Sequence, residues 1–171
     1  MDYAQSTIVD VPDFPKPGII FKDITPMLAD AKAFNEVIET FVSRYQDKGI
    51  THFAGIESRG FIFAAPLAAA LGAGLVLIRK PGKLPRDVFT QDYDLEYGSD
   101  TIEVHRDAVG SGDKVVVLDD LIATGGTASA AVDLLKQTGA TVYELGAVIE
   151  LTFLKGREKI EGTEVHALIQ Y

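Results

Sequence analysis

The residues best suited to chemistry form one continuous segment, in which an apolar strand leads through two aspartates and a turn of small residues into a helix. This segment spans residues 115–127 and reads VVVLDDLIATGGT. Gly125 and Gly126 let backbone NH groups approach an anion, and the start of the following helix adds the positive end of its dipole. The hydroxyl groups of Thr124 and Thr127 can donate hydrogen bonds to the same anion. A phosphomonoester would fit this turn.

Two adjacent carboxylates precede the turn. Asp119 and Asp120 would repel a bare phosphate, but they can accept hydrogen bonds from the two hydroxyl groups of a ribose beside it. The alternative is an ordinary strand-to-helix turn with solvated aspartates. We prefer the ligand site, because the apolar strand, the acidic pair and the Thr/Gly turn occur together and in this order. Neither the lysine-containing phosphate loop nor the Gly-x-Gly-x-x-Gly fingerprint is present. The pattern predicts a ribose phosphate site.

The elements that must position this site alternate between strands and helices. Apolar residues at three- and four-residue steps from Phe34 to Tyr45 predict an amphipathic helix with Asp30 as its N-cap. The other expected elements are strands near 51–56, 74–78, 101–105, 114–118, 141–149 and 164–169, and helices near 61–71 and 127–137. This alternation predicts an α/β fold, with a central, mostly parallel sheet flanked by helices, in a single domain over residues 1–171.

Two segments lack a sustained hydrophobic period. Residues 10–18 contain three prolines and a glycine, which disfavour helix and strand alike, so we expect this stretch to be irregular and to belong to an N-terminal arm over residues 1–30. Residues 80–100 contain two prolines and several charges, and structureless loops of this length are uncommon unless they are functional. We therefore expect residues 80–100 to form a flexible lid.

Composition argues against several classes of function. Sixteen basic and 25 acidic residues give a formal net charge of −9, which opposes non-specific binding to nucleic acid. The chain has no cysteine, and His52, His105 and His166 lack metal-ligand spacing, so we expect no protein-built metal site. No apolar run approaches the roughly 18 residues that span a bilayer, and residues 1–5 lack the features of a secretion signal. We expect a cytoplasmic protein without membrane contact.

The segment 115–127 resembles the signature with which type I phosphoribosyltransferases bind 5-phosphoribosyl-1-pyrophosphate (PRPP). The resemblance implies the fold of that family and assigns Asp119 and Asp120 to the ribose hydroxyls. It also implies that the 5-phosphate is bound by Ala123, Thr124, Gly125, Gly126 and Thr127. In that family magnesium accompanies the pyrophosphate, and we expect it to be held mainly by substrate and water.

Five further segments are similar to adenine phosphoribosyltransferases. They are residues 12–26 (PDFPKPGIIFKDITP), 57–61 (ESRGF), 79–85 (RKPGKLP), 95–98 (LEYG) and 150–152 (ELT). The likeness extends in order over nearly the whole chain. It implies transfer of the 5-phosphoribosyl group from PRPP to adenine, giving AMP and pyrophosphate in purine salvage. It also implies a base-binding N-terminal arm and a flexible hood formed by the 80–100 loop.

Within this resemblance, Phe21 and Leu151 match residues that sandwich the base, and backbone groups around Ile20 and Lys22 read the amino-purine edge. An apolar slot with polar edges suits adenine. Without the family pattern, Phe21 and Leu151 would be interpreted as ordinary core residues. Many family members carry arginine where this chain has Lys22, and this difference leaves a backbone contact intact.

The resemblance also indicates which residues bind the pyrophosphate. Glu57, Ser58 and Arg59 match the loop that grips it, often with a cis peptide between the first two residues, and Arg59 would supply charge and donors to the reaction. Arg79, Lys80 and Lys83 form a local basic cluster that the resemblance places against pyrophosphate. The resemblance also implies that Arg79 reaches the site of a neighbouring subunit, and therefore that the protein is a homodimer. Solvated surface charges are the alternative for each of these basic residues.

Glu96 and Tyr97 match the hood residues of the family. The resemblance makes Glu96 the general acid/base for the proton of the attacking purine nitrogen, and Tyr97 closes over the substrates. Alone, a glutamate in a polar loop would be a solvated charge. Two other functions remain open. The base could be hypoxanthine or xanthine, or the fold could act as a PRPP-sensing regulator that binds nucleic acid, although such a protein would need a basic face.

Overall fold

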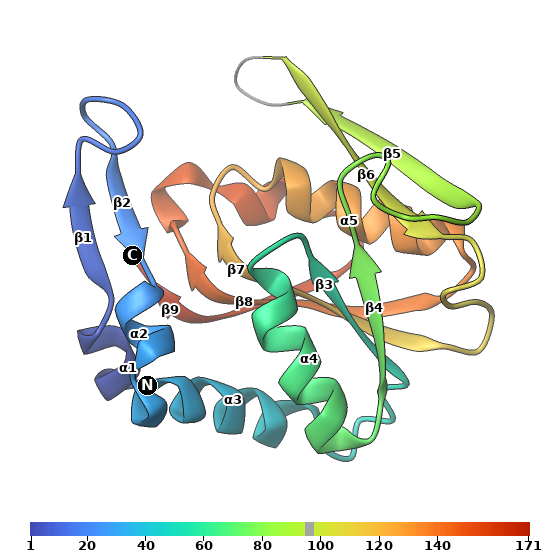
Figure 1. The fold of residues 1–171 in the computed structure, drawn as a ribbon, viewed down its shortest axis with the longest axis horizontal. Helices are drawn as coiled ribbons and strands as arrows, with labels where there is room; N and C mark the ends of the chain where they lie inside the picture. Colours follow the sequence, from blue (N-terminus) through green and yellow to red (C-terminus); the bar gives the residue numbers. More distant parts are fainter. Residues whose placement is uncertain (95–97) are drawn as a thin grey trace. The chain divides into compact units, whose positions relative to one another are not determined.

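The computed structural model describes residues 1–94 and 98–171 (Figure 1). The chain forms two compact units, Met1–Arg44 and Tyr45–Tyr171, each with its own elements. The organisation of residues 1–171 as one domain stays a prediction.

The first unit contains more regular structure than the sequence pattern predicts. Its strands β1 (Val9–Pro12) and β2 (Ile20–Asp23) form an antiparallel hairpin, so the expectation that residues 10–18 are irregular is wrong for residues 10–12. Pro12 is tolerated because it ends an edge strand, where no ladder hydrogen bond from its nitrogen is needed. The helices of this unit are α1 (Asp2–Ser6), α2 (Thr25–Ala29) and α3 (Ala31–Tyr45), of which the last residue belongs to the second unit.

Helix α3 begins as predicted. The Oδ1 atom of Asp30 accepts hydrogen bonds from the backbone NH groups of Lys32 and Ala33, both at 2.9 Å. These are NH groups of the first turn, which have no partner within the helix. The N-cap prediction is therefore confirmed.

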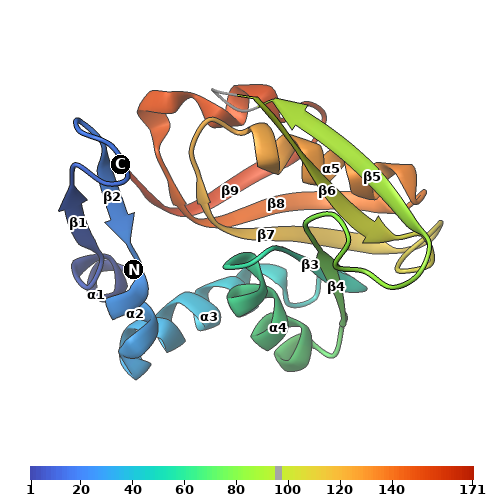
Figure 2. The same cartoon turned by 45° about the horizontal axis from the view of Figure 1, so that its top comes forward.

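The second unit is built on a five-stranded parallel sheet with the order β4-β3-β7-β8-β9. The strands are β3 (His52–Ile56), β4 (Gly74–Ile78), β7 (Lys114–Ile122), β8 (Thr141–Glu150) and β9 (Glu164–Gln170). Helices α4 (Gly60–Leu71) and α5 (Gly126–Gln137) lie on opposite faces of this sheet (Figure 2). The predicted α/β fold with a mostly parallel sheet flanked by helices is confirmed.

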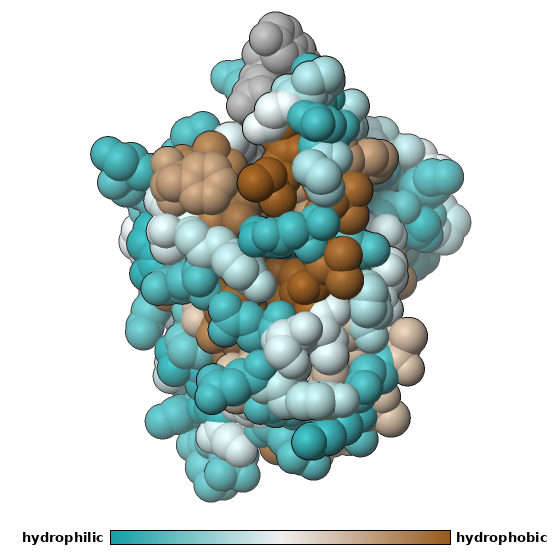
Figure 3. Space-filling model, turned by 90° about the vertical axis from the view of Figure 1, so that its left-hand side faces the viewer, coloured by the Kyte–Doolittle hydropathy of each residue, from teal (hydrophilic) through white to brown (hydrophobic). Residues whose placement is uncertain are grey.

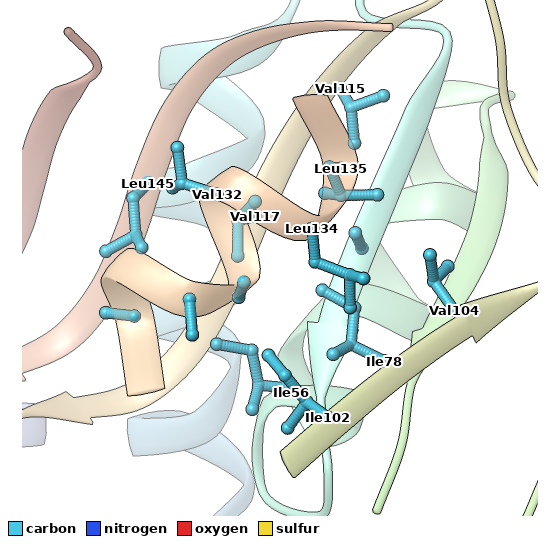
Figure 4. Packing of buried hydrophobic residues seen from close by; sticks show 14 of the residues in the cluster. Ile56, Ile78, Ile102, Val104, Val115, Val117, Val132, Leu134, Leu135 and Leu145 are labelled. Atoms are coloured by element: carbon cyan, nitrogen blue, oxygen red, sulfur yellow. The ribbon is translucent and has the colours of Figure 1, made fainter. Parts of the chain in front are cut away.

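The core of this unit explains why β7 reads as a continuous apolar run. Val115 and Val117 pack in one cluster with Leu134 and Leu135 of α5 (Figure 4). Val116 and Leu118, whose side chains point to the opposite face of the sheet, are also fully buried, since α4 covers that face. At the start of α4, a Cβ atom added at Gly60 would lie 2.4 Å from the carbonyl oxygen of Leu118. A glycine is required there, and it brings the α4 N-terminus close to β7.

Much of the segment 80–100 is regular. Strands β5 (Val88–Asp94) and β6 (Ser99–His105) form an antiparallel hairpin, so the prediction that this segment lacks secondary structure is wrong. Tyr93, Ile102 and Val104 are buried and belong to the cluster that packs against α5. Charged residues on the other face mask this alternation in the sequence. The flexibility of the segment stays a prediction.

Hydrophobic residues also reach the surface. Figure 3 shows one face of the molecule on which hydrophobic residues gather among hydrophilic ones. In the first unit, exposed apolar side chains lie on or between the two strands of the β1–β2 hairpin: Val9, Phe14, Ile19 and Ile20. Surface patches of this kind are often ligand sites, so the hairpin is a candidate binding element.

Candidate functional site

The predicted phosphate turn lines a small cavity between β7 and α5. Gly125 adopts a φ of 81°, in the left-handed region that favours glycine, and α5 begins at the next residue. The cavity has a volume of about 100 Å³ and is lined by Asp119 and residues 121–128. It therefore brings together Ala123, Thr124, Gly125, Gly126 and Thr127, the residues expected to bind the 5-phosphate.

A second segment supports this turn from behind. Gly156 opens a short 3₁₀ helix (Gly156–Lys159), and a Cβ atom on it would lie 2.2 Å from the carbonyl oxygen of Ala123. The Oγ of Ser129 donates a hydrogen bond to the carbonyl oxygen of Lys159 at 3.0 Å, which ties α5 to the same segment. The sequence analysis missed Gly156, and no motif around it indicates this contact.

A larger cavity adjoins the first. Its volume is about 410 Å³, and it shares Asp119, Leu121 and Thr127 with the small cavity. Its other lining residues come from the ends of β3 and β7, the following loops and the hairpin: Ile56, Glu57, Ser58, Arg59, Lys80, Tyr93 and Asp120. Asp119 thus lies where the two cavities meet, with Asp120 beside it in the larger one, and a ribose with phosphates at both ends would fit this arrangement. Ile56, Tyr93 and Leu121 were not predicted.

The acidic pair is partly neutralised by arginine. The Nε of Arg59 lies 2.7 Å from Oδ2 of Asp120, whose side chain is only 8% exposed. The backbone NH of Asp120 donates to Oδ1 of Asp119 at 2.9 Å. Burial, together with the neighbouring Asp120 carboxylate, raises the pKa of Asp119 well above its ordinary value. Asp119 is therefore held ready to accept a proton or a hydroxyl hydrogen bond.

Glu57 braces the loop rather than offering its carboxylate to a ligand. Its Oε2 accepts hydrogen bonds from the backbone NH of Lys80 at 2.9 Å and from Nε of Arg79 at 3.2 Å. These two donors, in that order, lower the pKa of Glu57 despite partial burial. The peptide bond between Glu57 and Ser58 is cis, as the family pattern implies. Ser58 and Arg59 line the cavity together with Glu57.

The basic cluster divides between the cavity and its surroundings. Lys80 lines the larger cavity, where its Nζ forms an ion pair with Asp100 and donates to the hydroxyl of Tyr93 at 2.9 Å. Arg79 lies outside the lining and pairs with Glu57 of its own chain. Lys83 is exposed and also lies outside it. Of the three residues of this basic cluster, only Lys80 lines the cavity.

The expected base residues lie in different units. Phe21 is on β2 between Ile20 and Lys22, and its ring contacts that of Phe14 edge-on, with centroids 5.2 Å apart. The Nζ of Lys22 forms an ion pair with Asp10 at 2.6 Å, so its side chain braces the hairpin. Phe21 is half-buried and Ile20 is exposed, which is unlike a residue pair from a core.

Leu151 follows β8 in the second unit and is half-buried. Its backbone NH donates to the carbonyl oxygen of Ile122 at 2.9 Å, beside the end of β7. The preceding Glu150 is buried and accepts hydrogen bonds from Arg157, including one from Nε at 2.7 Å. This hydrogen bond, the largest influence, outweighs burial and lowers the pKa of Glu150. The ion pair fixes the turn that carries Leu151.

Two expected catalytic residues, Glu96 and Tyr97, lie outside the described residues. Among residues 1–94 and 98–171, no group of three or more His, Asp or Glu side chains is arranged to hold a metal ion. In the same part of the chain, no helix combines the length and the apolar character needed to cross a membrane.

The comparisons with known proteins agree with this geometry. The phosphoribosyl transferase domain family matches residues 25–166. An adenine phosphoribosyltransferase of Arabidopsis thaliana is 54% identical over 171 residues, which cover 100% of this chain and 94% of that protein. The chain belongs to the adenine phosphoribosyltransferase family. A further adenine phosphoribosyltransferase, from Roseiflexus sp., is 54% identical over 96% of this chain and 95% of its own length.

Solved structures of adenine phosphoribosyltransferases have the same fold. That of Thermoanaerobacter pseudethanolicus superposes with a TM-score of 0.95 at 48% identity, covering 99% of both chains. That of Saccharomyces cerevisiae, complexed with D-2,5-dideoxy-2,5-imino-altritol 1,6-bisphosphate and adenine, has a TM-score of 0.92 at 41% identity, covering 98% of both chains. The expected type I phosphoribosyltransferase fold is therefore confirmed.

Proposed function

We propose that the chain transfers the 5-phosphoribosyl group of PRPP to adenine, forming AMP and releasing pyrophosphate in purine salvage. The observation that carries this proposal is the pair of adjoining cavities, which share Asp119, while Asp120 lines the larger one. The small cavity is lined by a glycine turn at a helix N-terminus, and the larger cavity is lined by Arg59 and Lys80 among other residues. PRPP has the same layout, with a ribose between a monophosphate and a pyrophosphate.

PRPP binds across both cavities in this proposal. Its 5-phosphate accepts hydrogen bonds from the NH groups of residues 123–127, where the α5 dipole favours an anion. Its ribose hydroxyls donate to the carboxylates of Asp119 and Asp120. Its pyrophosphate lies in the larger cavity with Ser58, Arg59 and Lys80, whose charges stabilise it as it leaves. Glu57 stabilises the loop through its hydrogen bonds to Arg79 and Lys80, while Arg79 and Lys83 contribute positive charge from positions outside the cavity lining.

Adenine is held by the apolar residues assigned from the family pattern. Phe21 stacks on the ring, Leu151 contacts its other face, and backbone groups of Ile20 and Lys22 recognise the amino edge. The half-buried state of Phe21 and Leu151 supports a ligand contact over plain core packing. A pocket that hydrogen-bonds an amino group strongly rejects bases that lack it, such as hypoxanthine or xanthine.

In the transfer step, the N9 atom of adenine forms a bond to C1′ of the ribose while the bond from C1′ to the pyrophosphate oxygen breaks. The proton on N9 passes to Glu96, and the electron pair of the broken bond leaves with pyrophosphate. Residues 80–100, with Tyr97, close over the reacting atoms and exclude water, which would otherwise hydrolyse PRPP. Arg59 stabilises the developing charge on the leaving group.

Magnesium is the proposed cofactor. Its chemistry is to neutralise the charge of the pyrophosphate. The residues fit a cation that arrives with its substrate, since Glu57 and Asp120 are already paired with arginines and the described part of the chain has no three-ligand cluster. Phosphate oxygens and water then supply most of the ligands, as magnesium prefers.

We also propose a cytoplasmic homodimer. Strand β4 is an edge of the sheet, and its Leu75 and Leu77 are exposed by 44% and 38%. A second copy of the chain would cover these side chains and bring Arg79, which follows β4, near the site of its partner. Sedimentation velocity is expected to give a dimer, and Leu75→Glu with Leu77→Glu should give a monomer. Charged substrates such as PRPP and AMP do not cross membranes unaided, which supports the cytoplasm.

The decisive experiment measures AMP formation from adenine and PRPP with magnesium. Adenine, hypoxanthine and xanthine then compete in one PRPP-consumption assay, and adenine should be consumed first. Consumption of another purine in preference would reassign the base. PRPP binding without consumption would support the regulator alternative, which the net charge of −9 disfavours.

A further inference from the structure

Lys80 is held by two residues of the hairpin that have no part in the proposed transfer. Its Nζ forms an ion pair with Oδ2 of Asp100, and the Tyr93 hydroxyl lies 2.9 Å from the same Nζ. The hydroxyl of Tyr93 in turn donates to Oδ2 of Asp100 at 3.1 Å, and Oδ1 of Asp100 accepts from the NH of Thr101 at 2.8 Å. Tyr93 and Asp100 lie directly opposite each other in the β5–β6 register. The three side chains form a closed cluster.

The cluster changes the charge of the pyrophosphate cavity. Two basic residues line that cavity, and both are paired: Arg59 with Asp120, and Lys80 with Asp100. Asp120 has a proposed task at the ribose. Asp100 does not line the cavity, so the transfer itself gives no reason for a carboxylate beside Lys80.

We propose that Asp100 tunes the site to release pyrophosphate, by pairing with Lys80 and competing with the product for the ammonium group. This inference rests on the proposed function and goes beyond it, because it assigns a positioning residue that adjusts product affinity. Lys80 has three donors, of which the cluster uses two, so an incoming anion takes the third and competes with Asp100 for the positive charge. The carboxylate also repels the anion directly.

The size of the effect follows from Coulomb's law. A unit charge about 4 Å from a bound anion, in a water-like dielectric, changes the affinity for the anion about three- to tenfold at low ionic strength. Asn at position 100 keeps the shape and an oxygen acceptor for Lys80, but it loses the charge. Asp100→Asn should therefore bind pyrophosphate more tightly without disturbing the hairpin.

The test is calorimetric titration of the full chain with inorganic pyrophosphate and magnesium chloride. Asp100→Asn should lower the Kd for pyrophosphate about three- to tenfold, with a smaller effect at high salt. The KM for adenine should not change. The matched control is Asp107→Asn, which removes the same charge from an exposed ion pair with Arg86 just after the same hairpin. This control should leave the Kd for pyrophosphate unchanged.

The outcomes separate the inference from the proposed function. An unchanged affinity for pyrophosphate in Asp100→Asn would overturn the inference. A weaker affinity would also overturn it, because Asp100 would then be needed to hold Lys80 in place. Asp100→Ser, with the same charge change and a smaller side chain, should show the same tightening and serves if the first variant misfolds. Lys80→Met tests the assignment of Lys80 to pyrophosphate, on which the inference rests. If it binds pyrophosphate like the wild type, Lys80 does not contact the product and the inference fails, whereas the proposed function is tested separately by AMP formation.

Discussion

The carbonyl oxygen of Gly156 would lie 2.0 Å from a Cβ atom added at Gly125. The backbones of these two residues, which are distant in the sequence, therefore pack directly against each other. Gly125 also needs its φ of 81°, so its glycine serves two purposes, whereas at Gly156 a Cβ atom is excluded by the carbonyl oxygen of Ala123 at 2.2 Å and the backbone nitrogen of Gly125 at 2.9 Å. The proposed phosphate turn therefore packs against a segment that is distant in the sequence and does not line either cavity.

Gly156→Ala tests this support. The added methyl group would meet the carbonyl oxygen of Ala123 at 2.2 Å, so the turn must shift. We expect kcat/KM for PRPP to fall about 10- to 100-fold, because misplacing a bound phosphate by about 1 Å misaligns the reacting centre. The free energy of unfolding should fall by about 1 to 3 kcal/mol.

The matched control is Gly110→Ala, at a position where the nearest atom to the added Cβ, other than those of neighbouring residues, is 3.9 Å away. It should leave kcat/KM and thermal unfolding close to wild type. Equal losses in the two variants would mean that Gly156 has no special relation to the phosphate turn.

Asp119→Asn is expected to weaken PRPP binding while stabilising the fold. The substitution replaces a charged acceptor for a ribose hydroxyl by a neutral one, and hydrogen bonds to charged groups contribute about 1.5 to 3 kcal/mol. The Kd for PRPP, measured by titration, should rise about 10- to 100-fold. An unchanged Kd in the folded variant would remove Asp119 from the ribose site.

The expected stabilisation of the fold by Asp119→Asn depends on pH. Since burial raises the pKa of Asp119 in the fold, its ionised form opposes folding at neutral pH. This opposition is complete above the raised pKa and disappears as the pH falls towards the ordinary aspartate value of about 3.9. The variant should thus unfold at a higher temperature than wild type at pH 7, and the gap should close on acidification. A gap that widens in acid would contradict the prediction.

The sequence predicts the parts of the site that lie in one continuous segment. Asp119, the phosphate turn and the start of α5 follow each other along the chain, so local residue types suffice. The contacts of Gly156 and Tyr93 depend on distant segments. Tyr93 reaches the cavity because the hairpin pairs it with Asp100 and packs it against α5, which no local pattern indicates.

The same distinction holds for the fold. The parallel strands were predicted because helices cover both faces, which leaves long apolar runs such as that of β7. The hairpins were missed because each has only one buried face or is short, so that charged residues and prolines interrupt the pattern. Lys80 lines the cavity whereas Arg79 and Lys83 do not. The spacing of basic residues in a loop does not determine which of their side chains point toward a cavity.

Phe21→Ala should raise the KM for adenine far more than the KM for PRPP. Stacking on a base contributes roughly 1 to 3 kcal/mol, so the increase is about 5- to 150-fold. Val9→Ala, an exposed change on the partner strand of the same hairpin, controls for loosening of the hairpin and should alter neither constant. Steady-state kinetics with each substrate varied in turn give both values. Equal losses for the two substrates would assign Phe21 to packing against Phe14 instead.

Glu96→Leu should lower turnover while leaving PRPP binding nearly unchanged. In the proposed mechanism this residue takes the N9 proton of adenine, and general acid/base groups contribute about 100- to 10,000-fold. Leucine keeps similar bulk, so closure over the substrates should survive. Glu96→Gln also keeps the hydrogen-bonding shape without the proton acceptor, and it should be impaired to a similar extent.

Single-turnover measurements show whether the loss lies in the chemical step, because they do not depend on product release. If both Glu96 variants matched wild type in single-turnover rate across pH, Glu96 would be a solvated charge and the proton would pass to water or another group. A large rise in the Kd for PRPP in both variants would instead assign Glu96 to substrate positioning. Recovery in Glu96→Gln but not in Glu96→Leu would indicate a hydrogen bond without proton transfer.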